Sequence, residues 1–98
     1  MPELDVIVLG GAAMDRVAEV GQLPTRDAVV LAWSDQQYPG GSSANVAVGL
    51  ARLMHRTGFV GKIGDDANGE LLLAAFADEG VDVGALIVER GYPTATCF

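Results

Sequence analysis

A glycine-rich stretch that leads directly into an apolar helix pattern constrains this chain most. Pro39, Gly40 and Gly41 predict a bend, and the run from Asn45 to Leu53 has helix-forming composition. Where a loop opens a helix, free N–H groups and the positive end of the helix dipole favour a polar or anionic ligand. One apolar stripe along this helix is expected from the residues at positions 46, 47, 50, 53 and 54.

The same stretch has a plainer interpretation. Gly40-Gly41 also suits an ordinary turn, and Ser42 or Ser43 also suits a helix N-cap without any ligand. Glycine, however, lets a ligand approach the backbone closely because it has no Cβ. Other features of the chain are needed to distinguish a ligand-binding loop from an ordinary turn.

Length and charge exclude several classes of protein. The 98 residues suffice for one small domain, and half of them are hydrophobic. There are 6 basic and 13 acidic residues, without a basic cluster, which argues against a nucleic-acid partner. No apolar run approaches the ~20 residues of a membrane span, and the first residues lack the positive charge of a signal peptide.

The single cysteine and the last residues carry two further expectations. Cys97 excludes an internal disulfide and fits a reducing, cytoplasmic location, and it is expected as a small buried residue in a strand. The stretch from Thr94 to Phe98 has the pattern of a strand that nothing terminates. We therefore expect the chain to be the front part of a longer protein.

The order of strand and helix patterns predicts a layered α/β domain. Residues 5–10 predict a buried, parallel and central strand, and residues 12–20 suit either a short helix or a strand. In the second case residues 17–33 are expected to supply two strands of a small separate sheet, and residues 27–33, rich in β-forming side chains, are the second of them. Further strands are predicted at 57–64, 86–89 and 94–98, and a helix at 71–79, with Asp66 as its N-cap and Gly80 after its end.

Two polar side chains stand at places where an α/β protein binds ligands. Asp15 follows the first strand, and its two oxygens suit a vicinal diol, although an ordinary turn also accounts for it. Asn45 at the loop–helix junction both donates and accepts hydrogen bonds, although helix capping also accounts for it. Together with the Gly40-Gly41 backbone they would form a polar pocket suited to a sugar.

Other kinds of site find little support. His55 has no second His or Cys at metal-ligand spacing, and the acidic run 65–70 lacks the alternating oxygen ligands of a calcium loop. Gly10-Gly11 resembles the start of a dinucleotide fingerprint, but Asp15 and Arg16 stand where its third glycine would open a helix. A dinucleotide-binding domain is therefore the weakest hypothesis.

Taken together, these motifs resemble the N-terminal region of the ribokinase-like (PfkB) carbohydrate kinases. The order and spacing of the matching pieces hold along nearly the whole chain. The pieces are residues 6–10 with Asp15, 23–24, 40–47, 51–53, 59–66, 69–72, 80–82 and 93–96. The resemblance implies a three-layer fold with a mostly parallel central sheet and a small β-sheet lid. Residues 1–98 would then be the N-terminal part of one domain, with lid strands within about 16–37, in place of a helix at 12–20.

The resemblance also implies a reaction and a set of substrate-binding residues. Family members transfer the γ-phosphoryl group of ATP, with Mg²⁺, to a hydroxyl of a sugar or nucleoside, and many form homodimers through the lid. Asp15, Gly40, Gly41 and Asn45 match the family's substrate-binding positions. Thr96 lies near a strand that often lines the same pocket.

The sequence departs from the family pattern in several places. Ala13 stands where ribokinase has an asparagine that touches the sugar, Ser43 where a smaller residue is usual, and Met54 where a glycine is usual. The family's catalytic aspartate lies in a Gly-x-Gly-Asp motif near the C-terminus, with the nucleotide site close by, and this sequence has no such motif. We therefore assign no catalytic, nucleotide-binding or metal-binding residue here and expect the chain alone to be inactive. The alternative is a non-catalytic sugar-binding or interaction module of the same fold.

Overall fold

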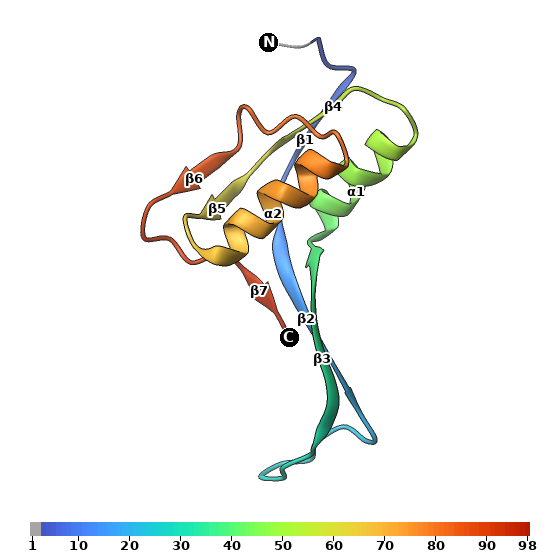
Figure 1. The fold of residues 1–98 in the computed structure, drawn as a ribbon, viewed down its shortest axis with the longest axis vertical. Coiled ribbons are helices and arrows are strands. Elements are labelled where there is room, and N and C mark those ends of the chain that lie inside the picture. The colour runs from blue at the N-terminus through green and yellow to red at the C-terminus, as the bar shows by residue number, and fades with distance from the viewer. Residues whose placement is uncertain (1–2) are drawn as a thin grey trace.

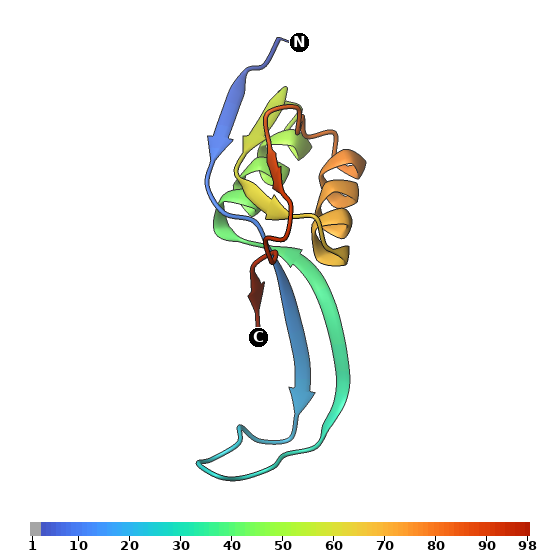
Figure 2. The same cartoon turned by 90° about the vertical axis from the view of Figure 1, so that its left-hand side faces the viewer.

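The computed structural model describes residues 3–98 as a mixed α/β body from which a long hairpin projects (Figures 1 and 2). Two helices and seven strands follow one another in the described part of the chain. Their order is β1 (Val6–Leu9), β2 (Ala13–Val20), β3 (Ala32–Gly40), α1 (Ser42–Arg52), β4 (Thr57–Val60), β5 (Lys62–Gly64), α2 (Ala67–Asp78), β6 (Ile87–Glu89) and β7 (Thr96–Cys97).

The strands form three small sheets. In the body, β1 pairs in parallel with β4, and β5 pairs in parallel with β6. The third sheet has the order β3-β2-β7, with β2 and β3 antiparallel and β7 parallel to β2. The far ends of β2 and β3 extend well beyond the body (Figure 2), which gives the molecule a length of 52 Å and a thickness of 19 Å. We call the β2–β3 hairpin, residues 13–40, the lid.

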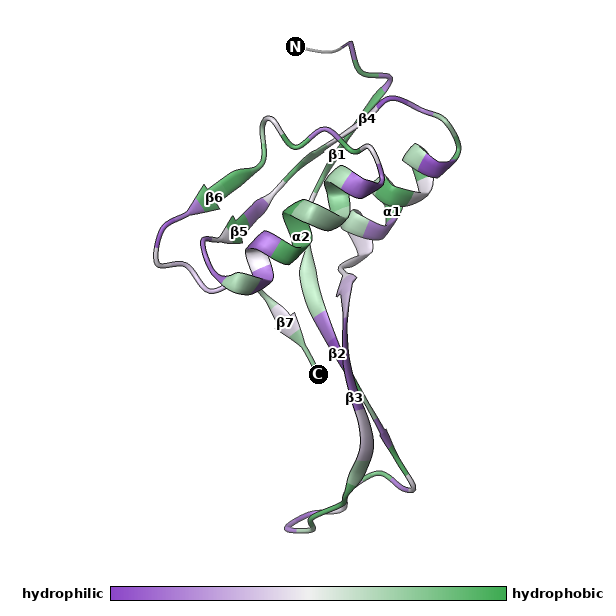
Figure 3. Cartoon of the chain, in the orientation of Figure 1, coloured by the Kyte–Doolittle hydropathy of each residue, from purple (hydrophilic) through white to green (hydrophobic). Residues whose placement is uncertain are grey.

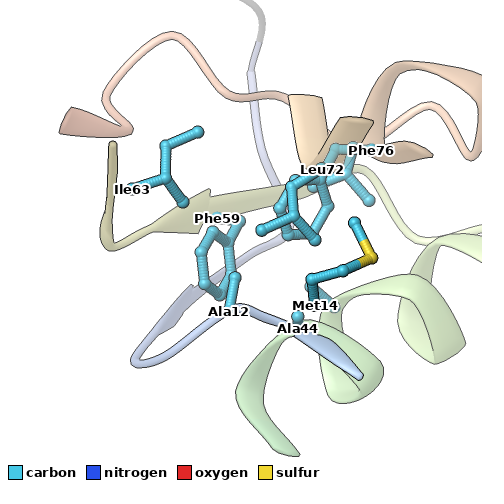
Figure 4. Close-up of a cluster of buried hydrophobic side chains, with 9 residues drawn as sticks. Ala12, Met14, Ala44, Phe59, Ile63, Leu72 and Phe76 are labelled. Carbon is cyan, nitrogen blue, oxygen red and sulfur yellow. The ribbon is translucent and has the colours of Figure 1, made fainter. Parts of the chain in front are cut away.

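The hydrophobic core lies between the helices and the strands β4 and β5. Phe59 and Phe76 stack with their ring centroids 4.8 Å apart, and Met14 at the base of the lid reaches into the same cluster (Figure 4). The lid is therefore anchored to the body by a buried side chain. The other buried members are Ala12, Ala44, Ala47, Ile63, Leu72 and Val81.

The first strand is parallel as predicted, but it is neither buried on both faces nor central among the described residues. It pairs there with β4 alone, and Ile7 and Leu9 are 62% and 77% exposed, while Val8 packs against the core. Alternate residues of a strand point to opposite faces. Among the described residues only the face that packs against α1 is covered, so a strand that is apolar on both faces leaves one of them exposed.

The predicted strand at 57–64 is two strands. It breaks at Gly61, where a Cβ would meet the Phe59 ring at 2.8 Å and the backbone oxygen of Gly10 even more closely. After this break β4 pairs with β1 and β5 pairs with β6. The glycine therefore lets one apolar run serve two different sheets.

The buried face of α1 differs from the predicted stripe. Ala44 and Ala47 are buried and Val48 and Ala51 pack beside them, whereas Val46 is 54% exposed and Met54 lies beyond the helix end. The spacing 44, 47, 48 and 51 is itself a regular helical stripe. Small residues on this face let the helix lie close to β1 and β4.

The lid contains strands where a helix was the alternative. Residues 13–20 form β2, as the family resemblance implied, and β3 runs from Ala32 through Pro39 to Gly40. Of the strand expected at 27–33 only Ala32 and Trp33 belong to β3, and of the bend expected at 39–41 only Gly41 remains, because Pro39 and Gly40 are part of β3. The lid strands extend closer to the body than residues 16–37, because antiparallel pairing continues to Ala13 opposite Gly40.

An ion pair joins the starts of β1 and β4. The Asp5 carboxylate accepts hydrogen bonds from the Arg56 backbone N–H at 2.9 Å and from its guanidinium at 2.9 and 3.3 Å. These bonds lower the pKa of Asp5 from 3.8 to about 2.

Acid should therefore weaken this connection in a defined pH range. Because the pKa of Asp5 is lower in the folded state, the ionised carboxylate stabilises the fold at pH values above 3.8. This stabilisation is lost as the pH falls from 3.8 to about 2. We expect the urea midpoint of Asp5→Asn to lie below that of the wild type at pH 5 and to converge with it near pH 2. A difference that stays constant across this range would contradict the assignment.

Candidate functional site

Asp15 lies on β2 where the lid meets the body. Its direct neighbours across the sheet are Tyr38 on β3 and Cys97 on β7. Met14, the preceding residue, points into the core, so Asp15 points to the opposite face of this sheet. The core packing of one residue thus determines the direction of the next.

Gly40 and Gly41 lie directly against the Asp15 segment. A Cβ on Gly40 would overlap the Asp15 carboxylate, so that carboxylate rests against the Gly40 backbone. Gly41 has a φ of 99°, and a Cβ there would lie 2.8 Å from the Gly11 oxygen. The bend is therefore confined to Gly41. Because neither Gly40 nor Gly41 has a side chain, their backbone lies close to the Gly11 backbone and to the Asp15 carboxylate.

Gly41 is also the N-cap of α1, and no side chain caps this helix. The predicted capping by Ser42 or Ser43 is therefore absent from α1, and the helix begins at Ser42 and not at Asn45. The Ala44 N–H donates to the Gly11 oxygen at 3.3 Å, which fixes the helix start against the Asp15 segment. N–H groups of the first turn remain open to a ligand.

Asn45 occupies the first turn of α1 and is exposed. With Gly40 it lines one end of a groove of about 520 Å³ between α1 and α2, which Asp15 does not line. The structure therefore brings Asp15 and Gly40 into contact, with Gly41 against residues 11–13, and places Asn45 beside Gly40, on the groove side.

The strand β7 adds a residue that sequence reasoning missed. Cys97 is the direct partner of Asp15, whereas Thr96 is the partner of the buried Met14. Cys97, not Thr96, therefore shares the Asp15 face, and it is exposed, against the expectation of a buried cysteine. The sequence pattern located the strand but held no signal for its register against β2.

An ion pair connects the two strands of the lid. The Arg16 guanidinium donates to the Asp35 carboxylate at 2.5 to 3.2 Å across the two strands, which lowers the pKa of Asp35. Hydrophobic residues occur near the lid tip, as the colouring of Figure 3 shows, and four large side chains of the outer lid are exposed. They are Leu23, Val29, Leu31 and Trp33.

The structure also bears on dinucleotide-binding, metal-binding and membrane-spanning features. After Gly10-Gly11 the chain enters β2 and not a helix, so the dinucleotide fingerprint is not formed. Residues 3–98 contain no group of three or more His, Cys, Asp or Glu side chains placed to hold a metal ion. None of the helices in this part of the chain has the length and hydropathy needed to cross a membrane.

Known proteins with similar sequences and folds are carbohydrate kinases. The family model of the pfkB family carbohydrate kinases matches residues 3–98. A 5-dehydro-2-deoxygluconokinase of Shouchella clausii is 39% identical over 88 residues, which cover 90% of this chain and 26% of the kinase.

Two solved structures extend the similarity to the fold. Arabidopsis thaliana ribokinase, complexed with ribose and ATP, matches 95% of this chain with a TM-score of 0.83 and 34% identity. The aminoimidazole riboside kinase of Salmonella enterica, complexed with aminoimidazole riboside and an ATP analogue, matches 94% with a TM-score of 0.75 and 37% identity. This chain spans 30% and 27% of those two proteins. With its family match along nearly its whole length, its α/β fold and its lid, the chain belongs to the pfkB family of carbohydrate kinases.

Proposed function

We propose that this chain supplies the sugar-binding part of a kinase that transfers the γ-phosphoryl group of ATP to a hydroxyl of a sugar or nucleoside. The contact between the Asp15 carboxylate and the Gly40 backbone, next to Gly41 at the uncapped start of α1, carries the proposal. The relatives' substrates, among them ribose and aminoimidazole riboside, support the same chemical class.

The proposed roles follow from the chemistry of each group. Both oxygens of Asp15 accept hydrogen bonds, so the carboxylate would hold two neighbouring hydroxyls of the ligand. Gly40 and Gly41 would allow the sugar ring to lie against bare backbone. The Asn45 amide would donate to and accept from a further hydroxyl, with the adjoining groove leaving room for it.

Phosphoryl transfer needs groups that these residues do not supply. ATP and Mg²⁺ require ligands for the metal and the phosphates, and residues 3–98 contain no suitable acidic cluster. The sequence also lacks a Gly-x-Gly-Asp motif for the catalytic base. We therefore propose that this chain binds the sugar without phosphorylating it.

Two further proposals concern assembly and location. A homodimer through the lid would cover the exposed apolar side chains near its tip, Val29 and Trp33 among them. The single cysteine fits a reducing, cytoplasmic location.

The proposed function is tested by calorimetric titration of the 98-residue chain with ribose, 5-dehydro-2-deoxygluconate and aminoimidazole riboside. We expect at least one of them to bind, and no transfer of phosphate from ATP to any of them. Asp15→Asn is expected to weaken the binding roughly tenfold, because one charge-assisted hydrogen bond is lost, and Asp15→Ala to weaken it further.

The matched control is Asp27→Asn, which makes the same change of charge at an almost fully exposed position of the lid. It should leave the affinity unchanged. Equal affinities of wild type and Asp15→Ala would remove Asp15 from the site. Robust sugar phosphorylation by the chain would refute the proposal that it binds the sugar without phosphorylating it.

A further inference from the structure

Among the described residues, the strand that flanks Asp15 makes few contacts within its own sheet. β7 consists of Thr96 and Cys97, and it pairs with β2 at only two positions. The Met14 N–H also donates to the Ala95 oxygen at 2.9 Å. A contact outside this sheet provides a fixed point for the segment that leads into β7.

That fixed point is Thr94, which Asp66 holds with both carboxylate oxygens. Asp66 Oδ2 accepts from the Thr94 N–H at 2.9 Å, and Oδ1 accepts from the Thr94 hydroxyl at 2.5 Å. Oδ1 also accepts from the Gly69 N–H at 2.9 Å, as the N-cap of α2. One carboxylate thus connects the start of α2 to the start of β7.

The directions of these bonds favour an ionised carboxylate. Thr94 is only 5% exposed, and its Oγ1 accepts from the Gly64 N–H at 2.9 Å, so its single hydroxyl proton is left for Asp66. All three groups that face Asp66 therefore donate. The hydrogen bonds from Thr94 come first among the causes that lower the pKa of Asp66.

The surrounding backbone is packed too closely for this junction to shift. A Cβ on Gly64 would overlap the Tyr92 carbonyl, and one on Gly69 would lie 3.1 Å from Thr94 Oγ1. Three chain segments therefore meet around the Asp66–Thr94 contact. From this point β7 runs beside β2 (Figure 1), where Cys97 is paired with Asp15.

We propose that Asp66 is a positioning residue of the sugar site, which acts through Thr94 to place β7, and with it Cys97, beside Asp15. This inference rests on the proposed function for its effect on sugar binding. Asp66 itself does not touch the sugar in this proposal.

The test uses Asp66→Asn, because asparagine is as good a helix N-cap as aspartate and keeps α2 in place. It has one acceptor oxygen, so its NH₂ group must face one of the donors. Amide hydrogen exchange at Met14, whose N–H bonds to Ala95, reports the position of the β7 segment, and exchange at Phe59, whose N–H bonds to Asp82, reports the body.

We expect Met14 exchange to be roughly tenfold faster in Asp66→Asn, with Phe59 unchanged, and the sugar Kd to rise by a similar factor. Thr94→Val should act in the same direction, and Thr94→Ser, which keeps the hydroxyl, should restore both values. Asp65→Asn is the matched control, because Asp65 bonds to the Gly91 N–H and not to Thr94.

Unchanged Met14 exchange in Asp66→Asn would overturn the inference, and so would faster exchange with an unaltered sugar Kd. A wild-type chain that binds none of the sugars would contradict the proposed function and remove the inferred effect on binding. The exchange measurements need no sugar, so these failures can be told apart.

Discussion

Gly41→Ala is expected to destabilise the fold by roughly 3 kcal/mol and to abolish sugar binding, because the backbone strain at this position costs about 1–3 kcal/mol and a steric overlap adds to it. The φ of 99° at Gly41 is a conformation that a residue with a Cβ rarely adopts. The added Cβ would also lie 2.8 Å from the Gly11 oxygen and 3.0 Å from Ala12 Cα. Relief of this overlap would move the start of α1 away from the Asp15 segment.

Urea unfolding measures the loss of stability, and calorimetry measures the loss of binding. Gly49→Ala is the control, because Gly49 lies within α1 and an added Cβ meets nothing within 4 Å. Alanine favours helix over glycine, so this variant should gain up to about 1 kcal/mol. A Gly41→Ala chain as stable as the wild type would show that the bend does not depend on this conformation.

Phe76→Ala is expected to cost about 3–5 kcal/mol, the usual range for removing a buried aromatic side chain. Phe76 is 1% exposed and stacks on Phe59 with an angle of 24° between the rings. Its removal would leave a cavity between α2, β4 and the base of the lid. Small domains have only about 5–15 kcal/mol of total stability, so much of the chain should unfold at moderate temperature.

The thermal midpoint and the urea midpoint check this prediction. Leu71→Ala is the control on the same helix, because Leu71 is 50% exposed, and we expect it to cost less than about 1 kcal/mol. Equal losses for the two variants would mean that the stacked pair is not the centre of the core.

The sequence contains enough local signal to predict the candidate site. Asp15 follows an apolar strand, and Gly41 stands before a helix pattern, and these two features alone indicate a place for a ligand. In the fold, Asp15 lies against Gly40 and close to Gly41. The contact does not extend to Asn45, whose side of the helix start faces the groove between α1 and α2.

Other features depend on pairings between distant segments, which local patterns do not record. The choice of Cys97 over Thr96 as the neighbour of Asp15 follows from the register of β7 against β2. The Asp66–Thr94 contact joins residues 28 positions apart. The sequence predicts Asp66 as an N-cap, and only the packing of two backbone segments around it reveals its second role.

By itself the sequence determined the α/β class, the family, the position of the glycine-to-helix junction and the caps of α2, because propensity and capping act over a few residues and the order of motifs can be followed along the chain. The tertiary structure alone decided which face of α1 is buried, where the strand at 57–64 breaks and which residues surround Asp15. An apolar pattern predicts that a side chain will be buried away from water. Which element covers that side chain depends on the whole arrangement of strands and helices.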